Sequence, residues 1–390
     1  MAGRNAIKGQ LHSTSTERER ALLIAVQSEG AGDRWSADDS LAELSRLAES
    51  AGAEVVGVQS QRLGRPSGSH YIGRGKVEEL LELKTTLRYS LLVADDELSP
   101  RQQRTLEDEL DVRVIDRTAL ILDIFAHQAR TSEGKLQVEL AQHRYLLPRL
   151  IGRWEHLERL GGGIGTRGPG ESQLETDRRL IRLHIKRLEN DLEGVRRHRE
   201  VYRSKRRKEG VPLVALVGYT NAGKSTLFNT LSQAAVSAEN RLFTTLDPVT
   251  RRVRLPGGTA MLITDTVGFI HKLPPSIIAA FRTTLEELDE ADLLLHVVDI
   301  THKDASRQHS TVERILAEIG LSAKPVVTAL NKVDLLDGRP DEDGSVPVHE
   351  RLAATRTDFV PVSAVTGWNT VELLERIEAV LSSLSSGPPA

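Results

Sequence analysis

Apolar runs alternate with segments of helical periodicity along the first third of the chain. Four runs have the continuous apolar character of buried strands: residues 21–26, 54–58, 91–94 and 112–115. Three segments predict helices, of which the first has Leu41, Leu44 and Leu47 on one face and the last has Asp116 as its N-cap: residues 40–51, 76–87 and 117–128. This alternation predicts a small parallel sheet, in an α/β domain over residues 21–130. The basic, Gly-rich stretch 62–75 predicts an exposed loop.

From residue 135 onward the apolar positions step by three and four instead. One series is Leu136, Leu140, His143, Leu147, Leu150, Trp154 and Leu157, and a second is Ile181, Ile185, Leu188, Leu192 and Val195. This spacing keeps one seam of each helix turned toward a partner. The run 161–170 is rich in glycine and contains a proline, so it interrupts the helix. We therefore expect an antiparallel helical hairpin over residues 131–209, with a Gly-rich loop at its tip and a kink at Pro148.

Charge adds a second feature to this hairpin. The whole chain has 52 basic and 55 acidic residues, for a formal net charge of −3, yet residues 178–208 hold 13 Lys and Arg against four acidic residues. Such a run is either a solvated helix face or a surface for a polyanion, whose condensed counterions clustered cations release.

Composition narrows the classes of protein that remain. With 39% hydrophobic and 27% charged residues the chain is typical of an ordinary globular protein, and its 390 residues predict two or three domains. The absence of cysteine excludes disulfides, thiolate metal sites and cysteine nucleophiles. No apolar stretch has the length of a membrane span and no secretory signal is recognised, so we expect a cytoplasmic protein, with a peripheral membrane fraction as an alternative. Histidine and acidic residues show no metal-ligand spacing in the sequence.

A phosphate-binding loop stands out after residue 210. An apolar strand, residues 211–217, leads into Gly218-Tyr219-Thr220-Asn221-Ala222-Gly223-Lys224-Ser225, and residues 226–231 are helical in pattern. This is the G-x-x-x-x-G-K-S motif in its strand–loop–helix context. The backbone amides and the helix N-terminus favour phosphate, Lys224 neutralises the β- and γ-phosphates, and Ser225 offers a hydroxyl to Mg²⁺.

Two further segments complete the predicted phosphate and Mg²⁺ site. Asp265-Thr266-Val267-Gly268 follows an apolar strand, so Asp265 reaches Mg²⁺ through water and the Gly268 amide contacts the γ-phosphate. Phe243-Thr244-Thr245-Leu246-Asp247 occupies the position of a first switch, and its Thr245 is the second hydroxyl that we assign to Mg²⁺. Lys224, Thr245 and Gly268 are thus the candidate catalytic residues.

The base is predicted by two segments nearer the C-terminus. Asn331-Lys332-Val333-Asp334 follows the strand 325–330, and a carboxylate at Asp334 accepts from both N1–H and the exocyclic amine of guanine. Adenine lacks this pair of donors, so the motif selects GTP over ATP. Ser363-Ala364-Val365 follows the strand 359–362 and suits backbone contact with guanine O6. Five motifs in this order predict a P-loop GTPase domain over residues 210–386.

Two residues bear on the rate of hydrolysis. Phe269 follows the Asp-x-x-Gly motif, where many GTPases have a glutamine that orients the attacking water. We therefore expect slow hydrolysis by the protein alone and acceleration by a partner, whereas a purely packing Phe269 is compatible with the same slow rate. Asn221 is typical of GTPases that bind K⁺ beside the phosphates, with structural capping as the alternative.

The whole chain resembles the HflX family of the Obg–HflX group of GTPases. Beyond the GTPase motifs, the resemblance rests on the run 161–179, Gly161 to Arg179, on Tyr71-Ile72-Gly73-Arg74-Gly75-Lys76, on Phe125-Ala126-His127-Gln128-Ala129, and on the switch segment 242–247. It implies an N-terminal α/β domain, a helical hairpin and a GTPase domain that bind the large ribosomal subunit (50S) and dissociate stalled or idle 70S ribosomes. Ribosomal RNA is then the polyanion, and the candidate contacts are Arg167, Arg196, Arg197, Arg203, Arg206 and Arg207.

Alternatives to this function stay open at this point. In the alternative, the protein is an RNA-remodelling factor or a large-subunit assembly factor that GTP regulates, and its N-terminal domain uses ATP. That domain has no recognisable phosphate loop, since Gly73-Arg74-Gly75-Lys76 is only a fragment of one. We expect a monomer that binds GTP and GDP. Some family members carry a further C-terminal domain, and contacts through such a domain are not expected here.

Overall fold

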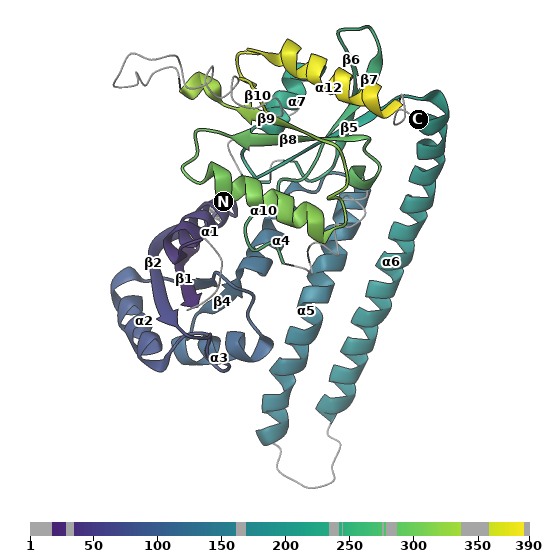
Figure 1. Cartoon of the computed structure of the whole chain (residues 1–390). Helices are drawn as coiled ribbons and strands as arrows, with labels where there is room; N and C mark the ends of the chain where they lie inside the picture. Colours follow the sequence, from purple (N-terminus) through teal and green to yellow (C-terminus); the bar gives the residue numbers. More distant parts are fainter. Residues whose placement is uncertain are drawn as a thin grey trace, which may run out of the picture.

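The protein was analysed as a computed structural model, which describes residues 18–28, 35–160, 169–233, 242–243, 245–274, 277, 287–336 and 359–385. Within these ranges, the side chains of residues 150–160, 169–175, 202–209 and 385 are not described. Figure 1 shows two α/β units and a long helical hairpin that extends away from both of them.

The N-terminal unit is built on a parallel four-stranded sheet in the order β2-β1-β3-β4. The strands are β1 (Arg20–Ser28), β2 (Glu54–Leu63), β3 (Leu91–Ala94) and β4 (Arg113–Asp116). Successive residues of β1 face opposite sides of the sheet, as a pleated strand requires. Leu23 packs toward α1 (Ala37–Ser50) and α4 (Arg117–Gln128), and Leu22 packs toward α2 (Arg74–Leu87) and α3 (Pro100–Leu110). The predicted parallel sheet is confirmed.

Local signals explain the ends of these helices and one omission. The Asp116 carboxylate accepts from the Ala119 amide at 2.9 Å, so the predicted N-cap of α4 is confirmed. Helix α3 was not predicted, although Ser99 and Gln102 form a reciprocal capping box with Pro100 at the first helical position. The prediction of an exposed loop over residues 62–75 was wrong in part, because Tyr71 and Ile72 are each 1% exposed and join the sheet core.

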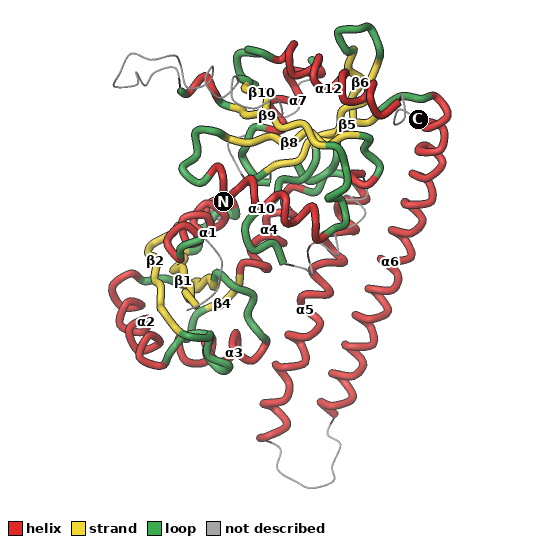
Figure 2. Tube along the Cα trace, viewed as in Figure 1, coloured by secondary structure: helices red, strands yellow, loops and turns green. Residues whose placement is uncertain are grey.

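The hairpin consists of α5 (Ser132–Leu160) and α6 (Pro169–Glu209), which run side by side in Figures 1 and 2. Leu140, Leu188 and Leu192 are buried between the arms with Leu136 and Ile185 beside them, which confirms the predicted seam over this stretch. Helix α5 continues through Pro148. It also packs on the N-terminal unit, where the Tyr145 hydroxyl donates to Asp116 at 3.0 Å. The base of the hairpin also reaches the C-terminal unit, where Arg199 of α6 pairs with Glu287 at 3.0 Å, so the two arms extend from contacts with both units.

The C-terminal unit has a six-stranded sheet in the order β10-β9-β8-β5-β7-β6. Its strands are β5 (Leu213–Gly218), β6 (Val249–Arg254), β7 (Ala260–Asp265), β8 (Leu293–Asp299), β9 (Val326–Asn331) and β10 (Phe359–Pro361), and only the β6–β7 pair is antiparallel. Helices α7 (Lys224–Ser232) and α12 (Thr370–Ser385) cover one face, and α10 (Ala305–Glu318) covers the other. Figure 1 shows the N-terminal unit on the α10 side.

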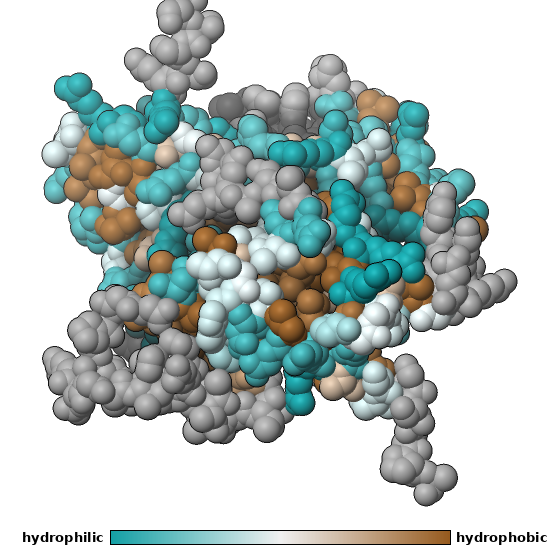
Figure 3. Space-filling model, turned by 90° about the horizontal axis from the view of Figure 1, so that it is seen from above, coloured by the Kyte–Doolittle hydropathy of each residue, from teal (hydrophilic) through white to brown (hydrophobic). Residues whose placement is uncertain are grey.

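The outer surface is mixed in polarity. The face seen in Figure 3 has apolar patches separated by hydrophilic side chains. Among the described helices, none combines the length and the apolar character that a membrane crossing needs.

Candidate nucleotide-binding site

The phosphate-binding loop lies between β5 and α7, as predicted, and close backbone packing explains its glycines. Gly223 has φ of 96° and precedes the first residue of α7, and a Cβ there would overlap the Asn331 amide nitrogen. A Cβ on Gly268 would lie 2.9 Å from both Lys224 Nζ and the Thr220 methyl carbon. Glycine is the residue that permits both approaches. The Asp265–Gly268 motif, which we call the second switch, thus lies directly against the phosphate loop.

Lys224 is buried inside this loop. Its Nζ donates to the carbonyl oxygens of Gly218 at 3.1 Å and Tyr219 at 2.9 Å, and the residue is 6% exposed. Burial lowers the pKa of Lys224 to about 8, although the nearby Asp265 carboxylate acts in the opposite direction. The loop therefore holds a desolvated cation at the place where phosphate charge is expected.

The three predicted Mg²⁺ residues converge on one point, although they come from three separate segments. Asp265 Oδ2 accepts from Ser225 Oγ at 2.6 Å and from Thr245 Oγ1 at 2.8 Å, and the two hydroxyl oxygens are 2.9 Å apart. Asp265 Oδ1 is buried and has no hydrogen-bond partner among the described residues. Burial raises the pKa of Asp265, against the effect of its hydrogen bonds and of Lys224. A carboxylate and two hydroxyls are hard oxygen donors, so this set fits Mg²⁺.

The predicted base-recognition segments also meet. The Asn331 amide donates to the Ala222 carbonyl at 2.9 Å and accepts from the Ala364 amide at 3.0 Å. It thereby joins the phosphate loop to the segment after β10. Asp334 accepts from the Ser363 hydroxyl at 2.6 Å.

The remaining residues of these two segments differ in exposure. Val333 and Ala364 are buried and Val365 is exposed, while Lys332 Nζ donates to Asp299 at 2.7 Å. One carboxylate and one backbone segment thus lie side by side where guanine recognition was predicted.

The first switch segment departs from the prediction. Phe243 and Leu246 were expected at the nucleotide, but their side chains lie in the core of the N-terminal unit, where the Phe243 ring meets the Phe125 ring edge-on at 4.8 Å between centroids. Asp247 accepts from the amides of Arg130 at 2.9 Å and Thr131 at 2.8 Å. The apolar side chains of Phe243 and Leu246 gain more by burial than they would beside a polar nucleotide. Thr244 lies outside the described residues.

The side chains that surround Gly268 in the second switch point into the protein. Thr266 is buried and donates to the Leu216 carbonyl, and Val267 packs against the N-terminal core. Phe269 is 2% exposed and packs with Leu294 and Val312, while its backbone pairs with the phosphate loop through Thr220 N to Phe269 O at 2.8 Å. The packing alternative for Phe269 is therefore what the structure has. Asn221 is exposed, with φ of 63°.

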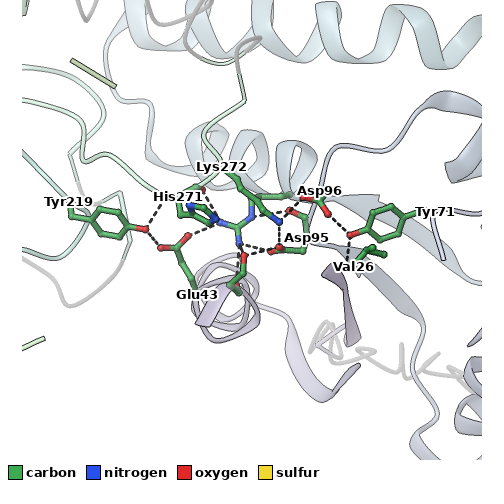
Figure 4. A network of polar contacts seen from close by, with 10 residues as sticks. Val26, Glu43, Tyr71, Asp95, Asp96, Tyr219, His271 and Lys272 are labelled. Atoms are coloured by element: carbon green, nitrogen blue, oxygen red, sulfur yellow. Dashed lines mark hydrogen bonds and ion pairs between the residues drawn. The ribbon is translucent and has the colours of Figure 1, made fainter. Parts of the chain in front are cut away.

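A buried polar network behind the loop was not predicted. Figure 4 shows it running from Tyr219 of the phosphate loop to Tyr71 of the N-terminal unit. The Tyr219 hydroxyl donates to Glu43 and accepts from the His271 amide at 2.8 Å. Lys272 Nζ lies 2.6 Å from both Asp95 and Asp96. The sequence contains only a weak signal for this network, because charged residues at strand ends and in loops are usually solvated.

Arg117 is at the centre of this network. It is 1% exposed and donates to Glu43 at 2.7 Å, to Asp95 at 2.5 Å and to the His271 carbonyl at 3.1 Å. Burial alone would lower the pKa of Arg117, but the two carboxylates outweigh it and raise that pKa. The same contacts hold the pKa of Asp95 well below its usual range despite burial. Both α/β units thus share one desolvated ion cluster.

The RNA-contact candidates are placed only in part. Arg196 and Arg197 are exposed on α6, and each pairs with the carboxylate of Glu193, at 3.9 Å and 3.8 Å. Arg203, Arg206 and Arg207 lie on α6, but their side chains are outside the described part of the chain, as is all of Arg167.

This fold and site define the chain as a P-loop GTPase. Models of three protein families match it: a GTP-binding GTPase N-terminal region over residues 38–126, a GTP-binding GTPase middle region over 128–206, and a 50S ribosome-binding GTPase over 213–332. The chain belongs to the HflX family of GTPases and is a GTP hydrolase.

Individual relatives agree with this membership. The GTPase HflX of Caldanaerobacter subterraneus is 49% identical over 84% of this chain and 75% of its own, and that of Escherichia coli is 45% identical over 88% and 79%. Among solved structures, a GTP-binding protein of Sulfolobus solfataricus in complex with GDP is 24% identical over 94% of this chain and 99% of that one, with a TM-score of 0.45.

Proposed function

We propose that this GTPase binds the large ribosomal subunit through its hairpin and, with GTP bound, separates the subunits of stalled or idle 70S ribosomes. The observation that carries the proposal is the continuity between the basic arm and the nucleotide site. Helix α6 contains the run of 13 basic residues and ends at Glu209, and β5, which leads into the phosphate loop, begins at Leu213. A polyanion held by the arm is thus connected by a short segment to the element that senses the phosphates.

We further infer the role of each site residue. Lys224 neutralises the β- and γ-phosphates, and the Gly268 amide contacts the γ-phosphate. Mg²⁺ is held by Ser225 and Thr245, with Asp265 acting through water, and it neutralises charge that develops on the phosphates. The distances within this trio support the assignment. The division of the chain at residues 130 and 209, a monomeric state and a cytoplasmic location are parts of the same proposal.

Sucrose-gradient profiles of 70S ribosomes with the protein and a non-hydrolysable GTP analogue test the splitting activity. We expect the 70S peak to decrease and free subunits to appear. The double variant Arg196→Ala/Arg197→Ala should require more protein for the same effect, because two exposed cations are removed. Arg251→Ala/Arg252→Ala, which removes two exposed arginines of β6, is the matched control. Binding to 70S without loss of the peak would reject splitting in favour of an assembly role.

Base recognition is tested at Asp334. Asparagine cannot accept from both donors of guanine, so Asp334→Asn should lose affinity for GTP and gain affinity for xanthosine triphosphate. Fluorescent-nucleotide titration measures both affinities. Unchanged GTP affinity would reject the assignment of this carboxylate.

Slow hydrolysis by the protein alone is the second part of this proposal. It is supported by the burial of Phe269 at the position where a water-orienting residue is found in other GTPases. We expect added large subunits to raise the GTPase rate, and equal rates with and without them would contradict it. Asn221 is proposed to hold K⁺ beside the phosphates, which a comparison of rates in KCl and NaCl decides.

A further inference from the structure

Two histidines and one glutamate meet on the hairpin, away from the nucleotide site. Glu139 and His143 lie one turn apart on α5, and His184 faces them from α6. The glutamate Oε1 is 2.8 Å from His184 Nε2 and 3.9 Å from His143 Nε2, and one ligand atom from each of the three residues lies within 4.8 Å of the other two. The two imidazole rings meet edge-on with 4.8 Å between centroids.

We propose that these three side chains form a Zn²⁺ site that links the two arms of the hairpin. Two imidazole nitrogens and one carboxylate oxygen are a common protein ligand set for zinc, with water in the fourth position. Oxygen-preferring ions such as Mg²⁺ and Ca²⁺ are disfavoured by the two imidazoles.

The spacing of the ligand atoms is close to what the ion requires. With zinc–ligand bonds of about 2.0–2.1 Å, the ligand atoms of a tetrahedral site lie about 3.3 Å apart. The distances of 2.8 Å and 3.9 Å lie on either side of that value, so rotation of the exposed side chains is enough to close the site. Glu139 and His143 already share a face, because they are four residues apart on one helix, and the His184 ligand atom on the other arm already lies within 4.8 Å of both.

The packed seam of the hairpin supports the three ligands, and solvent reaches them. Leu140 and Leu188 are 4% and 3% exposed in the seam, and they fix the two helices beside the ligands. The side chains of Glu139, His143 and His184 are 45%, 29% and 40% exposed, so an ion enters from solvent. A bound ion would hold the arms together between the domain base and the tip.

The test is a Zn²⁺ titration of the full chain, treated with a chelator and then saturated with GDP and Mg²⁺ so that the nucleotide site is occupied. Competition with a chromophoric chelator gives affinity and stoichiometry. We expect one ion per chain, and His143→Gln should weaken binding on the order of 100-fold while the Glu139–His184 contact stays in place. His198→Gln, which removes an exposed histidine of α6 outside the cluster, should bind like the parent chain.

A second measurement separates ligation from a structural role. Co²⁺ substituted for Zn²⁺ should give the visible absorption of a four-coordinate nitrogen and oxygen site, which His143→Gln and His184→Gln both abolish. Circular dichroism and GDP affinity establish that the variants are folded. The proposal is overturned if the parent chain binds no Zn²⁺ under these conditions, or if His143→Gln and His198→Gln bind it equally.

Discussion

At the scale of single residues, the most consequential group in the nucleotide site is the buried amine of Lys224. Its Nζ donates to two carbonyl oxygens of its own loop. The lysine is therefore preorganised, but in an environment that disfavours its charge. Anionic phosphates favour the charged form again, so protonation and nucleotide binding are linked.

We predict that nucleotide binding takes up protons in alkaline solution. With a pKa of about 8, part of the Lys224 population in the nucleotide-free protein is neutral at about pH 8.5 and becomes charged on GTP binding. Calorimetry in buffers of different ionisation enthalpy should show a larger uptake at about pH 8.5 than at about pH 7. Lys224→Arg keeps its charge throughout and should show no such increase. Equal proton numbers at both pH values would contradict the prediction.

The same shift affects the stability of the nucleotide-free protein. The folded-state pKa of Lys224 lies below the ordinary value of 10.5, so the unfolded chain binds more protons between about pH 8 and 10.5. Below about pH 8 the buried charge of this lysine therefore destabilises the folded protein. This penalty decreases as the pH rises from about 8 toward 10.5, so the free energy of unfolding increases over that range. Saturation with nucleotide, which favours the charged form, should remove the effect.

At the scale of elements, the first switch segment is shared between the two α/β units. Thr245 contacts Ser225 and Asp265, whereas its neighbours Phe243 and Leu246 are buried in the N-terminal core. Phe243 has φ of 58°, a left-handed conformation that costs a bulky residue on the order of 1–3 kcal/mol and persists only when packing compensates. Its contact with Phe125 supplies that packing.

We predict that Phe243→Ala lowers the free energy of unfolding by about 3 kcal/mol, because it leaves a cavity beside Phe125. Urea unfolding followed by circular dichroism measures it. Leu335→Ala, at a position that is 61% exposed, should change stability by less than about 0.5 kcal/mol. A loss below about 1 kcal/mol for Phe243→Ala would contradict the prediction and mean that neighbouring side chains fill the space left by the ring.

At the scale of the whole molecule, the ion cluster around Arg117 joins the N-terminal unit to the second switch. Glu43 and Asp95 come from one unit, and the His271 carbonyl and Lys272 come from the other (Figure 4). Because Arg117, Glu43 and Asp95 are buried, removal of the arginine leaves the two carboxylates with uncompensated charge. The cluster therefore makes the relative position of the two units specific.

We predict that Arg117→Met destabilises the protein by about 3–5 kcal/mol, because it leaves Glu43 and Asp95 buried without their cation. Arg113→Met is the matched control, since that side chain is 61% exposed and pairs with Glu19 at the surface, and its effect should stay below about 1 kcal/mol. Chemical denaturation of the GDP-bound proteins measures both. Similar values for the two variants would show that the buried cluster contributes no more than a surface ion pair.

Motif residues such as Ser225 and Asp265 were predictable because local strand and loop patterns place them at the same edge of a parallel sheet. Helix α4 could be predicted from its cap and its apolar periodicity. Helix α3 is harder to recognise, because it is short and polar and its capping box is the main signal in its sequence. The Glu139–His143–His184 cluster is not visible in the sequence, because His184 comes from a second helix and lies 45 residues from Glu139.

The GTPase class could be inferred from the sequence alone, because phosphate and guanine recognition require particular residue types at fixed spacings on strand ends. The family followed from longer matching segments, above all residues 161–179. The sequence also determined the hairpin, since a three-and-four apolar repeat interrupted by glycine permits few other structures. Only the tertiary structure decided that Phe243 packs away from the nucleotide and that Arg117 lies buried between two units. Burial depends on what a distant segment brings to the same place, and a residue's local pattern does not contain that information.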